Sequence, residues 1–477
     1  MHRRLFAVLT LAVTTAWIAS AWADMDAKAA LSSASKALGA DGLTTLEFSG
    51  SGFDFVLGQN ATPASPWPKF NNKTYTRVIN FNPWATRMQR VRSQAENPPR
   101  GGGQQPVIGD QNQTQTAQGP AAADELMMTA PQAFLRIAAA APGVTAKSES
   151  KGGKKYTAVT FTANNKARTT GWINAQNQVE RVETKIDNNF FGDMVFETTF
   201  SDYKTMGGIP FPAHIVQKQG GHPVLDLTVT DVKLNVPPPT IPAAPAGPGG
   251  AAPAPLVSEK LSDGVWLVPG GYAAIVVDMK DHILIIEGGQ SDQRSQAVIA
   301  EAKRLVPGKA ITELVNTHSH LDHGGGLRAY VAEGATIITH EVNKPYYEKL
   351  WKIPHTLSPD RLAQNPKKAS FKTVKEKMTL TDGNHVVELY HMTDFGHHNG
   401  MLLVYLPREK ALIEADGYNP PATIAAQTPA VISPYTLSML AHIERLKLDV
   451  QRIIPIHLPG DNRKIGMPEL LKAVGKN

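Results

Sequence analysis

A stretch dominated by proline, alanine and glycine interrupts the middle of this chain, between Val236 and Pro255. Proline has no backbone N–H to donate and favours extended backbone, so this stretch cannot pack as a regular helix or strand. It predicts a semi-rigid linker over residues 237–256. A chain of 477 residues is long enough for more than one hydrophobic core. We therefore expect one folded domain over residues 24–236 and another over residues 257–477.

The first 23 residues have the pattern of a secretory signal peptide. Basic residues Arg3 and Arg4 precede an apolar run, and small residues at Ala21 and Ala23 form a cleavage site. The apolar run is at the short limit for a membrane span. We therefore expect residues 1–23 to be removed, with a periplasmic or secreted protein that has no stable membrane span.

The chain contains no cysteine. An exported form would have no disulfides, and any metal site must use His, Asp or Glu, which suits zinc or another divalent ion of the first transition row. The net charge of +6 is spread along the chain without a run of Lys or Arg. This distribution argues against a nucleic-acid partner.

Short β-rich runs separated by Asn and Gly turns fill the sequence before the linker. They cover residues 156–162, 179–186, 194–200 and 225–232. This pattern predicts a mainly antiparallel β domain of the α+β class with one solvated face. Near residues 97–120, a composition rich in Gly, Gln, Pro and Asn predicts a disordered loop inside that domain.

The segment Gly207–Pro212, followed by a strand, resembles part of the curled β-sheet domains related to bacterial lipoprotein carriers. A concave face on this alternating sheet would suit a lipid or protein partner for the first domain. The sequence before the linker contains no recognisable catalytic constellation.

After the linker, apolar runs alternate with helical patterns. Residues 272–287, 311–315, 401–405, 411–415 and 452–456 predict buried strands, and residues 437–446 predict a helix. Ser291 is expected to cap a helix that ends before Pro307 and Gly308. This alternation predicts a mixed α/β domain over residues 257–477.

Twelve of the fifteen histidines lie between His282 and His457. The densest group is His318-Ser319-His320-Leu321-Asp322-His323, which directly follows an apolar strand. Alternate residues of an extended chain point to the same side, so His318 and His320 can hold one metal ion. Asp322 and His323 follow at a turn, where they can diverge toward a second ion. Such a group is costly to bury unless a cation binds, so we interpret the motif as a metal site rather than a solvated loop.

With this motif, residues 257–477 resemble the metallo-β-lactamase superfamily. The resemblance implies an αββα sandwich with the site at one edge of the paired sheets, and further ligands at later strand ends. His397 begins an H-x-x-G turn before an apolar strand, and His398 is the alternative if the turn shifts by one residue. Asp416 ends a strand and would bridge two ions. His457 follows the last strand, in a loop that lacks the family's flanking glycines.

The resemblance implies two divalent ions, which we expect to be Zn²⁺. One would be held by His318, His320 and His397, the other by Asp322, His323 and His457, and Asp416 would contact both. A metal-bridging hydroxide would be the nucleophile, because coordination lowers the pKa of water from about 15.7 to about 7. Asp322 would be catalytic as well as a ligand, since it would orient the nucleophile. Glu287 stands where many members carry a supporting Asp, and the sequence leaves open whether it serves that purpose.

The chain is thus predicted to be an exported metal-dependent hydrolase of an ester, thioester, lactone or amide bond in a small-molecule substrate. Three alternatives stand beside this prediction. One is β-lactam hydrolysis at a site made only of His and Asp. Another is redox chemistry on sulfur compounds at a single iron, which the second set of ligands disfavours. The third is a protein whose first domain binds lipid and whose metal domain is secondary.

Overall fold

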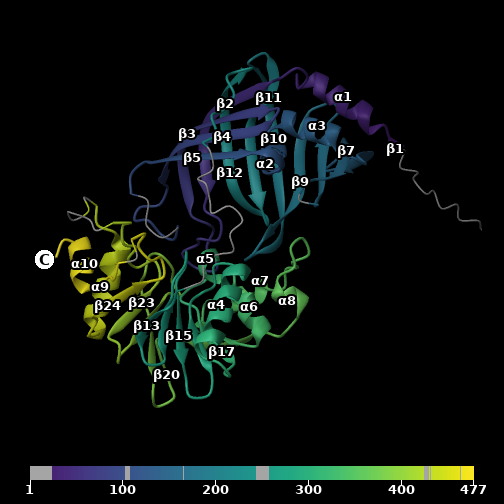
Figure 1. Ribbon diagram of the computed structural model, residues 1–477. Coiled ribbons are helices and arrows are strands. Elements are labelled where there is room, and N and C mark those ends of the chain that lie inside the picture. The colour runs from purple at the N-terminus through teal and green to yellow at the C-terminus, as the bar shows by residue number, and fades with distance from the viewer. Residues whose placement is uncertain are drawn as a thin grey trace, which may run out of the picture.

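The structure is a computed structural model that describes residues 24–102, 108–164, 166–242, 257–423, 429, 431–461 and 463–476. The predicted signal peptide and residues 243–256 of the predicted linker lie outside these residues. Figure 1 shows two bodies, one carrying the strands up to β12 and the other carrying the rest. We call residues 24–242 the N-terminal part and residues 257–476 the C-terminal part.

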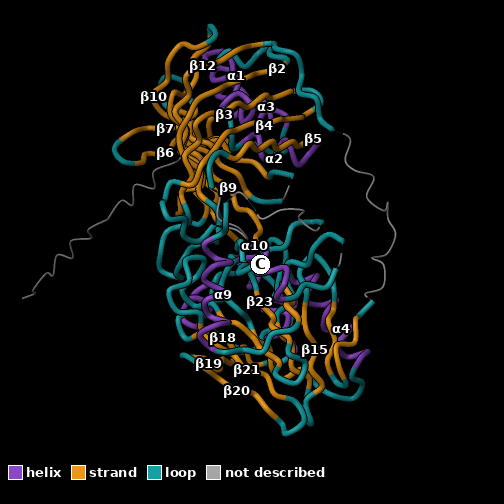
Figure 2. The backbone as a smooth tube through the Cα atoms, turned by 90° about the vertical axis from the view of Figure 1, so that its left-hand side faces the viewer, coloured by secondary structure: helices purple, strands orange, loops and turns teal. Residues whose placement is uncertain are grey.

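The N-terminal part is built on one antiparallel sheet that curls around itself (Figures 1 and 2). Its strand order among the described residues is β1-β6-β7-β8-β9-β10-β11-β12-β2-β3-β4-β5. The strands are β1 (Asp24–Met25), β2 (Thr45–Phe55), β3 (Lys69–Phe81), β4 (Trp84–Gln94), β5 (Gln111–Gln118), β6 (Thr145–Lys151), β7 (Lys154–Thr162), β8 (Arg168–Ile173), β9 (Val179–Asn188), β10 (Gly192–Met206), β11 (Ile209–Gln219) and β12 (His222–Leu234).

Helices cover one face of this sheet. They are α1 (Ala27–Ala37), α2 (Gly119–Met127) and α3 (Pro131–Ala140). Leu126 of α2 and Phe134 of α3 join Phe48, Ile79 and Leu227 of the sheet in one hydrophobic core. Each such side chain contributes about 1.5–3 kcal/mol on burial, so this core stabilises the N-terminal part independently of the metal site.

The prediction of a disordered loop near residues 97–120 is wrong for Gln111–Gln118, which form the edge strand β5. Residues 103–107 lie outside the described part of the chain. The polar composition of residues 111–118 did not indicate a strand, because their side chains bond to the neighbouring strand β4 instead of packing in the core. Arg90 donates to Gln113 at 2.8 Å, and Arg92 donates to Gln111 at 2.9 Å. Such cross-strand pairs stabilise a solvated sheet edge.

The described residues of the C-terminal part form two sheets. The first has the order β13 (Glu259–Ser262), β14 (Val265–Val268), β15 (Ala274–Asp278), β16 (Ile283–Ile286), β17 (Ile311–Val315), β18 (Thr336–His340) and β19 (Ser370–Val374). The second has the order β20 (Lys377–Thr381), β21 (Val386–His391), β22 (Leu402–Leu406), β23 (Ala411–Glu414) and β24 (Arg452–Pro455). The described helices are α4 (Asp292–Leu305), α5 (Leu321–Gly324), α6 (Leu327–Glu333), α7 (Lys344–Leu350), α8 (Arg361–Gln364), α9 (Pro434–Leu446) and α10 (Met467–Ala473).

Side-chain alternation along the buried strands produces four layers. Leu284 and Ile286 of β16 enter the core between the two sheets, whereas Ile283 and Ile285 pack beneath α4 and α6. The outer face of the second sheet packs against α9 and α10. The prediction of an αββα sandwich preceded by a mainly antiparallel β domain is confirmed.

Two of the predicted helix features are also confirmed. Ser291 caps α4 by accepting a bond from the backbone of Arg294 at 3.2 Å, and the helix expected over residues 437–446 lies within α9. None of the helices in the described ranges combines the length and the apolar character that a membrane crossing needs.

Candidate metal centre

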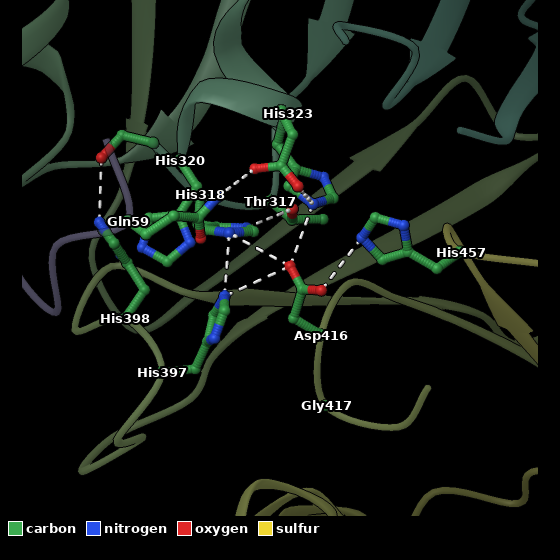
Figure 3. Close-up of polar contacts among 12 residues, drawn as sticks. Gln59, Thr317, His318, His320, His323, His397, His398, Asp416, Gly417 and His457 are labelled. Carbon is green, nitrogen blue, oxygen red and sulfur yellow. Dashed lines mark hydrogen bonds and ion pairs between the residues drawn. The ribbon is translucent and has the colours of Figure 1, made fainter. Parts of the chain in front are cut away.

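The predicted ligands gather at one edge of the sandwich, because the strands that carry them end there. β17 leads into the His318–His323 motif, while β23 and β24 run parallel and end just before Asp416 and His457. β22 runs antiparallel to β23, so the loop before it, which contains His397, reaches the same edge. Figure 3 shows these side chains pointing toward one another.

The first group of candidate ligands consists of His318, His320, His397 and Asp416, whose ligand atoms all lie within 4.8 Å of one another. Nε2 of His318 and Nε2 of His397 are 3.3 Å apart (Figure 3). Asp416 Oδ2 lies 3.5 Å from the first of these nitrogens and 3.3 Å from the second. All four side chains are buried.

The second group consists of Asp322, His323 and His457, again with ligand atoms within 4.8 Å. Asp416 lies between the two groups. Its Oδ2 is 3.0 Å from Nε2 of His323, and its Oδ1 is 3.0 Å from Nε2 of His457. Asp416 has a φ of 59°, a left-handed conformation that is rare outside glycine and clusters at functional sites.

His398 points away from both groups. Its Nε2 bonds to the Ser319 hydroxyl at 2.9 Å, and its Nδ1 accepts a bond from the backbone N–H of Gly400 at 2.9 Å. Both ring nitrogens are therefore engaged elsewhere. The structure brings His397 into the cluster and leaves His398 beside it (Figure 3).

A chain of hydrogen bonds sets which nitrogen of His318 faces the cluster. Thr317 donates from its backbone N and its hydroxyl to Glu287 Oε1, at 2.6 and 2.7 Å. Because the only hydroxyl proton of Thr317 is used in this way, its oxygen accepts from Nδ1–H of His318 at 3.1 Å. Nε2 of His318 is then left with its lone pair directed at the cluster.

Glu287 supports a second histidine in the same way. Its Oε2 lies 3.0 Å from Nδ1 of His323, and a carboxylate can only accept, so that nitrogen carries the proton. Glu287 is 1% exposed and has a φ of 59°. The sequence left open whether Glu287 replaces the family's supporting Asp, and the structure places it beneath the motif, bonded to Thr317 and His323.

Burial and neighbouring charge tune these groups for cation binding. Burial lowers the pKa of His320 to about 3 and that of His318 well below its usual value, so both imidazoles are neutral. Burial alone would favour the protonated acid of Asp416, but the imidazoles of His457, His397 and His323 hold its pKa well below the usual range. The neutral imidazoles of His318 and His320 beside the ionised carboxylate of Asp416 are a donor set that suits zinc.

The residues present fit a divalent cation. His320 Nδ1 is buried and has no hydrogen-bond partner among the described residues, although it belongs to the first group. An orphaned buried nitrogen is costly unless something binds it. In His323, burial would lower the pKa, but the carboxylates of Asp322, Glu287 and Asp416 raise it well above its usual value. The raised pKa of His323 favours a second ring proton at Nε2, in addition to the one on Nδ1. A cation bound at Nε2 would take the place of this second proton.

Several residues that touch the ligands were not predicted from the sequence. The Tyr272 hydroxyl donates to Asp322 Oδ2 at 3.1 Å, and its ring packs edge-on to His457. Gln59 and Asn60 of the N-terminal part contact Asp322 and His320. Tyr272 lies in an apolar run, and Gln59 and Asn60 lie in a distant loop. Their spacing in the sequence does not relate them to the metal-binding motif.

Comparison with known proteins agrees with this geometry. Residues 267–417 match the family model described as the metallo-beta-lactamase superfamily. A search of curated proteins finds no significant match. Similar solved structures include a metallo-beta-lactamase from Pontibacter korlensis, at 20% identity, covering 46% of this chain and 97% of that one with a TM-score of 0.34.

Another similar structure is a metallo-beta-lactamase from Hirschia baltica, at 18% identity, covering 46% of this chain and 97% of that one with a TM-score of 0.34. A double mutant of the sec-alkyl sulfatase PisA1 is 15% identical, and the match covers 46% of this chain and 40% of that one, also with a TM-score of 0.34.

Proposed function

Since the C-terminal part belongs to the metallo-β-lactamase superfamily and is a metal-dependent hydrolase domain, we propose that this chain hydrolyses an ester, thioester, lactone or amide bond with two Zn²⁺ ions bound at the site. The observation that carries the proposal is the position of Asp416. Its Oδ2 lies 3.3 Å from Nε2 of His397 in the first group and 3.0 Å from Nε2 of His323 in the second, and its Oδ1 lies 3.0 Å from Nε2 of His457 in the second. A carboxylate in this position can neutralise and separate two close dications.

One group of ligands would consist of His318, His320 and His397, and the other of Asp322, His323 and His457, with Asp416 shared. Bound zinc would supply a water of lowered pKa and polarise the scissile carbonyl. Side chains of the protein would orient the attacking water and transfer its proton.

Asp322 is the residue we expect to orient the attacking water. One of its oxygens is held by Gln59 at 2.8 Å and the other by the Tyr272 hydroxyl at 3.1 Å, so its plane is fixed at the edge of the site. A carboxylate held in this way can accept a proton from the water and pass it to the leaving group. Tyr272, as a neutral donor next to the second group, would help to keep Asp322 ionised.

Metal analysis and a substrate panel test the proposal on the purified full chain. We expect one ion for each group of ligands, and turnover of at least one lactone, thioester, ester or amide that chelation abolishes. His320→Ala should lose both activity and the first ion, whereas the matched control His282→Ala, at a half-buried pair with Glu313, should keep both. A single tightly bound iron, or full activity of His320→Ala, would contradict the proposal.

The panel also separates β-lactam hydrolysis from the other activities. Turnover of nitrocefin alone would identify a lactamase, whereas no nitrocefin turnover by zinc-loaded protein would exclude that activity.

We also propose that the protein is exported, on the basis of the basic, apolar and small-residue order of residues 1–23. Expression in a bacterial host should give a product that begins at Asp24 and fractionates with the periplasm. A cytoplasmic product that still begins at Met1 would contradict this.

A further inference from the structure

A loop of the N-terminal part lies along the metal-binding motif. It connects β2 to β3, and we call its residues 58–61 the clamp. Gly58 accepts a bond at its carbonyl from the backbone N–H of Leu321, at 3.3 Å. The next residue, Gln59, donates from Nε2 to Asp322 Oδ1 at 2.8 Å. Successive residues of the clamp therefore bond to successive residues of the motif.

Asn60 bonds to the motif through its backbone. Its carbonyl oxygen lies 2.9 Å from Nε2 of His320. A carbonyl can only accept, so Nε2 of His320 must carry the proton and Nδ1 must carry the lone pair. Nδ1 is the nitrogen of His320 that is buried without a hydrogen-bond partner within the described residues. The clamp thus selects the tautomer of His320 that can bind a cation.

The clamp continues to the loop that carries the third histidine. Ala61 accepts from the backbone N–H of Asn399 at 2.9 Å, two residues after His397. Gln59 and Asn60 are 6% and 3% exposed, so these bonds are shielded from water. Hydrogen bonds shielded in this way are stronger than those at the surface.

A second segment of the N-terminal part makes contact nearby. The backbone N–H of Gly101 donates to the carbonyl of Gly396 at 2.9 Å, and the carbonyl of Gly101 accepts from the Tyr435 hydroxyl at 2.9 Å. The ring of Tyr435 packs edge-on against His397. Two separate segments of the N-terminal part therefore abut ligand-bearing loops.

We propose that the clamp is part of the metal centre: it positions His320 and Asp322 for metal binding, and the N-terminal part is therefore required for tight metal binding and not only for substrate or partner binding. The proposal rests on the proposed metal-dependent function. Partners that orient metal ligands typically contribute 10–100-fold to metal affinity or activity.

Gly58 provides a sharp test because of its close approach. Its φ is 66°, and a Cβ added there would lie 2.9 Å from Cδ2 and 3.0 Å from Cβ of Leu321. Gly58→Ala should push the clamp away from the motif. Gly143 also has a φ of 66° but would meet nothing within 4 Å, so Gly143→Ala has the same backbone cost without displacing the clamp.

The experiment compares zinc binding by four variants of the full chain with that of the wild type, using competition with a chromophoric chelator. We expect Gly58→Ala and Gln59→Ala to bind at least one Zn²⁺ about 10–100-fold more weakly. Gly143→Ala and Gln176→Ala, the latter at an exposed turn, should stay within about twofold of the wild type.

Two further readouts separate positioning from general destabilisation. In the metal-free protein, amide exchange at Leu321 should become faster in Gly58→Ala but not in Gly143→Ala. After Co²⁺ loading, the visible spectrum should change in Gln59→Ala and not in Gln176→Ala, because the geometry at Asp322 has changed.

Wild-type zinc affinity in both clamp variants would overturn the proposal while leaving the hydrolase function intact. A wild-type chain that binds no zinc would instead refute the proposed function. If Gly58→Ala does not fold, the comparison between Gln59→Ala and Gln176→Ala decides.

Discussion

Replacing Glu287 with Gln changes the charge beneath the metal site while keeping the size of the side chain. Gln can still accept both bonds from Thr317 through its amide oxygen. Its NH₂ group, however, replaces Oε2, which now lies 3.0 Å from Nδ1 of His323. Two donors then face each other. His323 can relieve this only by moving its proton to Nε2, the nitrogen that faces Asp416 and the second group of ligands.

The loss should therefore appear in metal affinity. Removing an outer partner of a metal-binding histidine costs about 10–100-fold, which corresponds to about 1.4–2.8 kcal/mol of binding free energy. We expect Glu287→Gln to lower the affinity for the second Zn²⁺ by this amount, because His323 belongs to the second group. The affinity of the first group for Zn²⁺ should fall less. The amide oxygen of Gln still accepts from Thr317, which therefore continues to orient His318.

Stepwise titration with zinc against a chelator measures the two affinities separately. Glu341→Gln, at an exposed position, is the matched control and should leave both unchanged. A change of less than about twofold in both affinities for Glu287→Gln would refute the idea that Glu287 sets the proton position of His323.

Three further outcomes are expected. His457→Ala should lose the second ion and keep the first, because the His318, His320 and His397 set is intact; metal analysis that finds both ions would argue against His457 as a ligand. His398→Ala should keep both ions but lose about 1–3 kcal/mol of folding stability in urea titrations, because Ser319 Oγ and the N–H of Gly400 lose their buried partner; loss of an ion would reassign the ligand from His397 to His398. Hydrogen bonding to Arg452 and Lys464 lowers the pKa of Glu259 to about 2, so its stabilising effect is present above the ordinary glutamate pKa and is lost as the pH falls toward 2. The stability difference between the wild type and Glu259→Gln should be below about 1 kcal/mol because the carboxylate is partly exposed to solvent. This difference should shrink over that pH range, and a difference that stays constant would contradict the assignment.

The sequence predicted the parts of the site that follow from local spacing. The His318–His323 motif is contiguous, so its spacing and residue types identify it. Asp416 and His457 each end a short apolar run, and the resemblance to the metallo-β-lactamase superfamily identified them as ligands. Local patterning predicted a mixed α/β domain, since buried strands such as Ile283–Ile286 are apolar on both faces. The αββα order of the layers was predicted from the resemblance to the superfamily.

The remaining contacts depend on how distant segments dock. Gln59 and Asn60 sit in an ordinary turn-rich loop, and they reach Asp322 and His320 only because the N-terminal part packs against the motif. The prediction of a disordered loop at β5, made from composition, was wrong for a related reason. Its glutamines pair with Arg90 and Arg92 of the neighbouring strand, and such partners are not visible in a single segment.

The clamp also affects the order in which the protein can assemble. The bond between Asn60 and His320 joins residues 260 positions apart, and His457 lies still further along the chain. Domains tend to fold as units, beginning at the N-terminus during synthesis. The loop that selects the tautomer of His320 can therefore be in place before the motif has left the ribosome. Closing so long a loop costs only about 0.6 kcal/mol more than closing one half its length. A nascent chain that has not reached His457 lacks a complete ligand set, so we expect metal loading to be a late step in maturation.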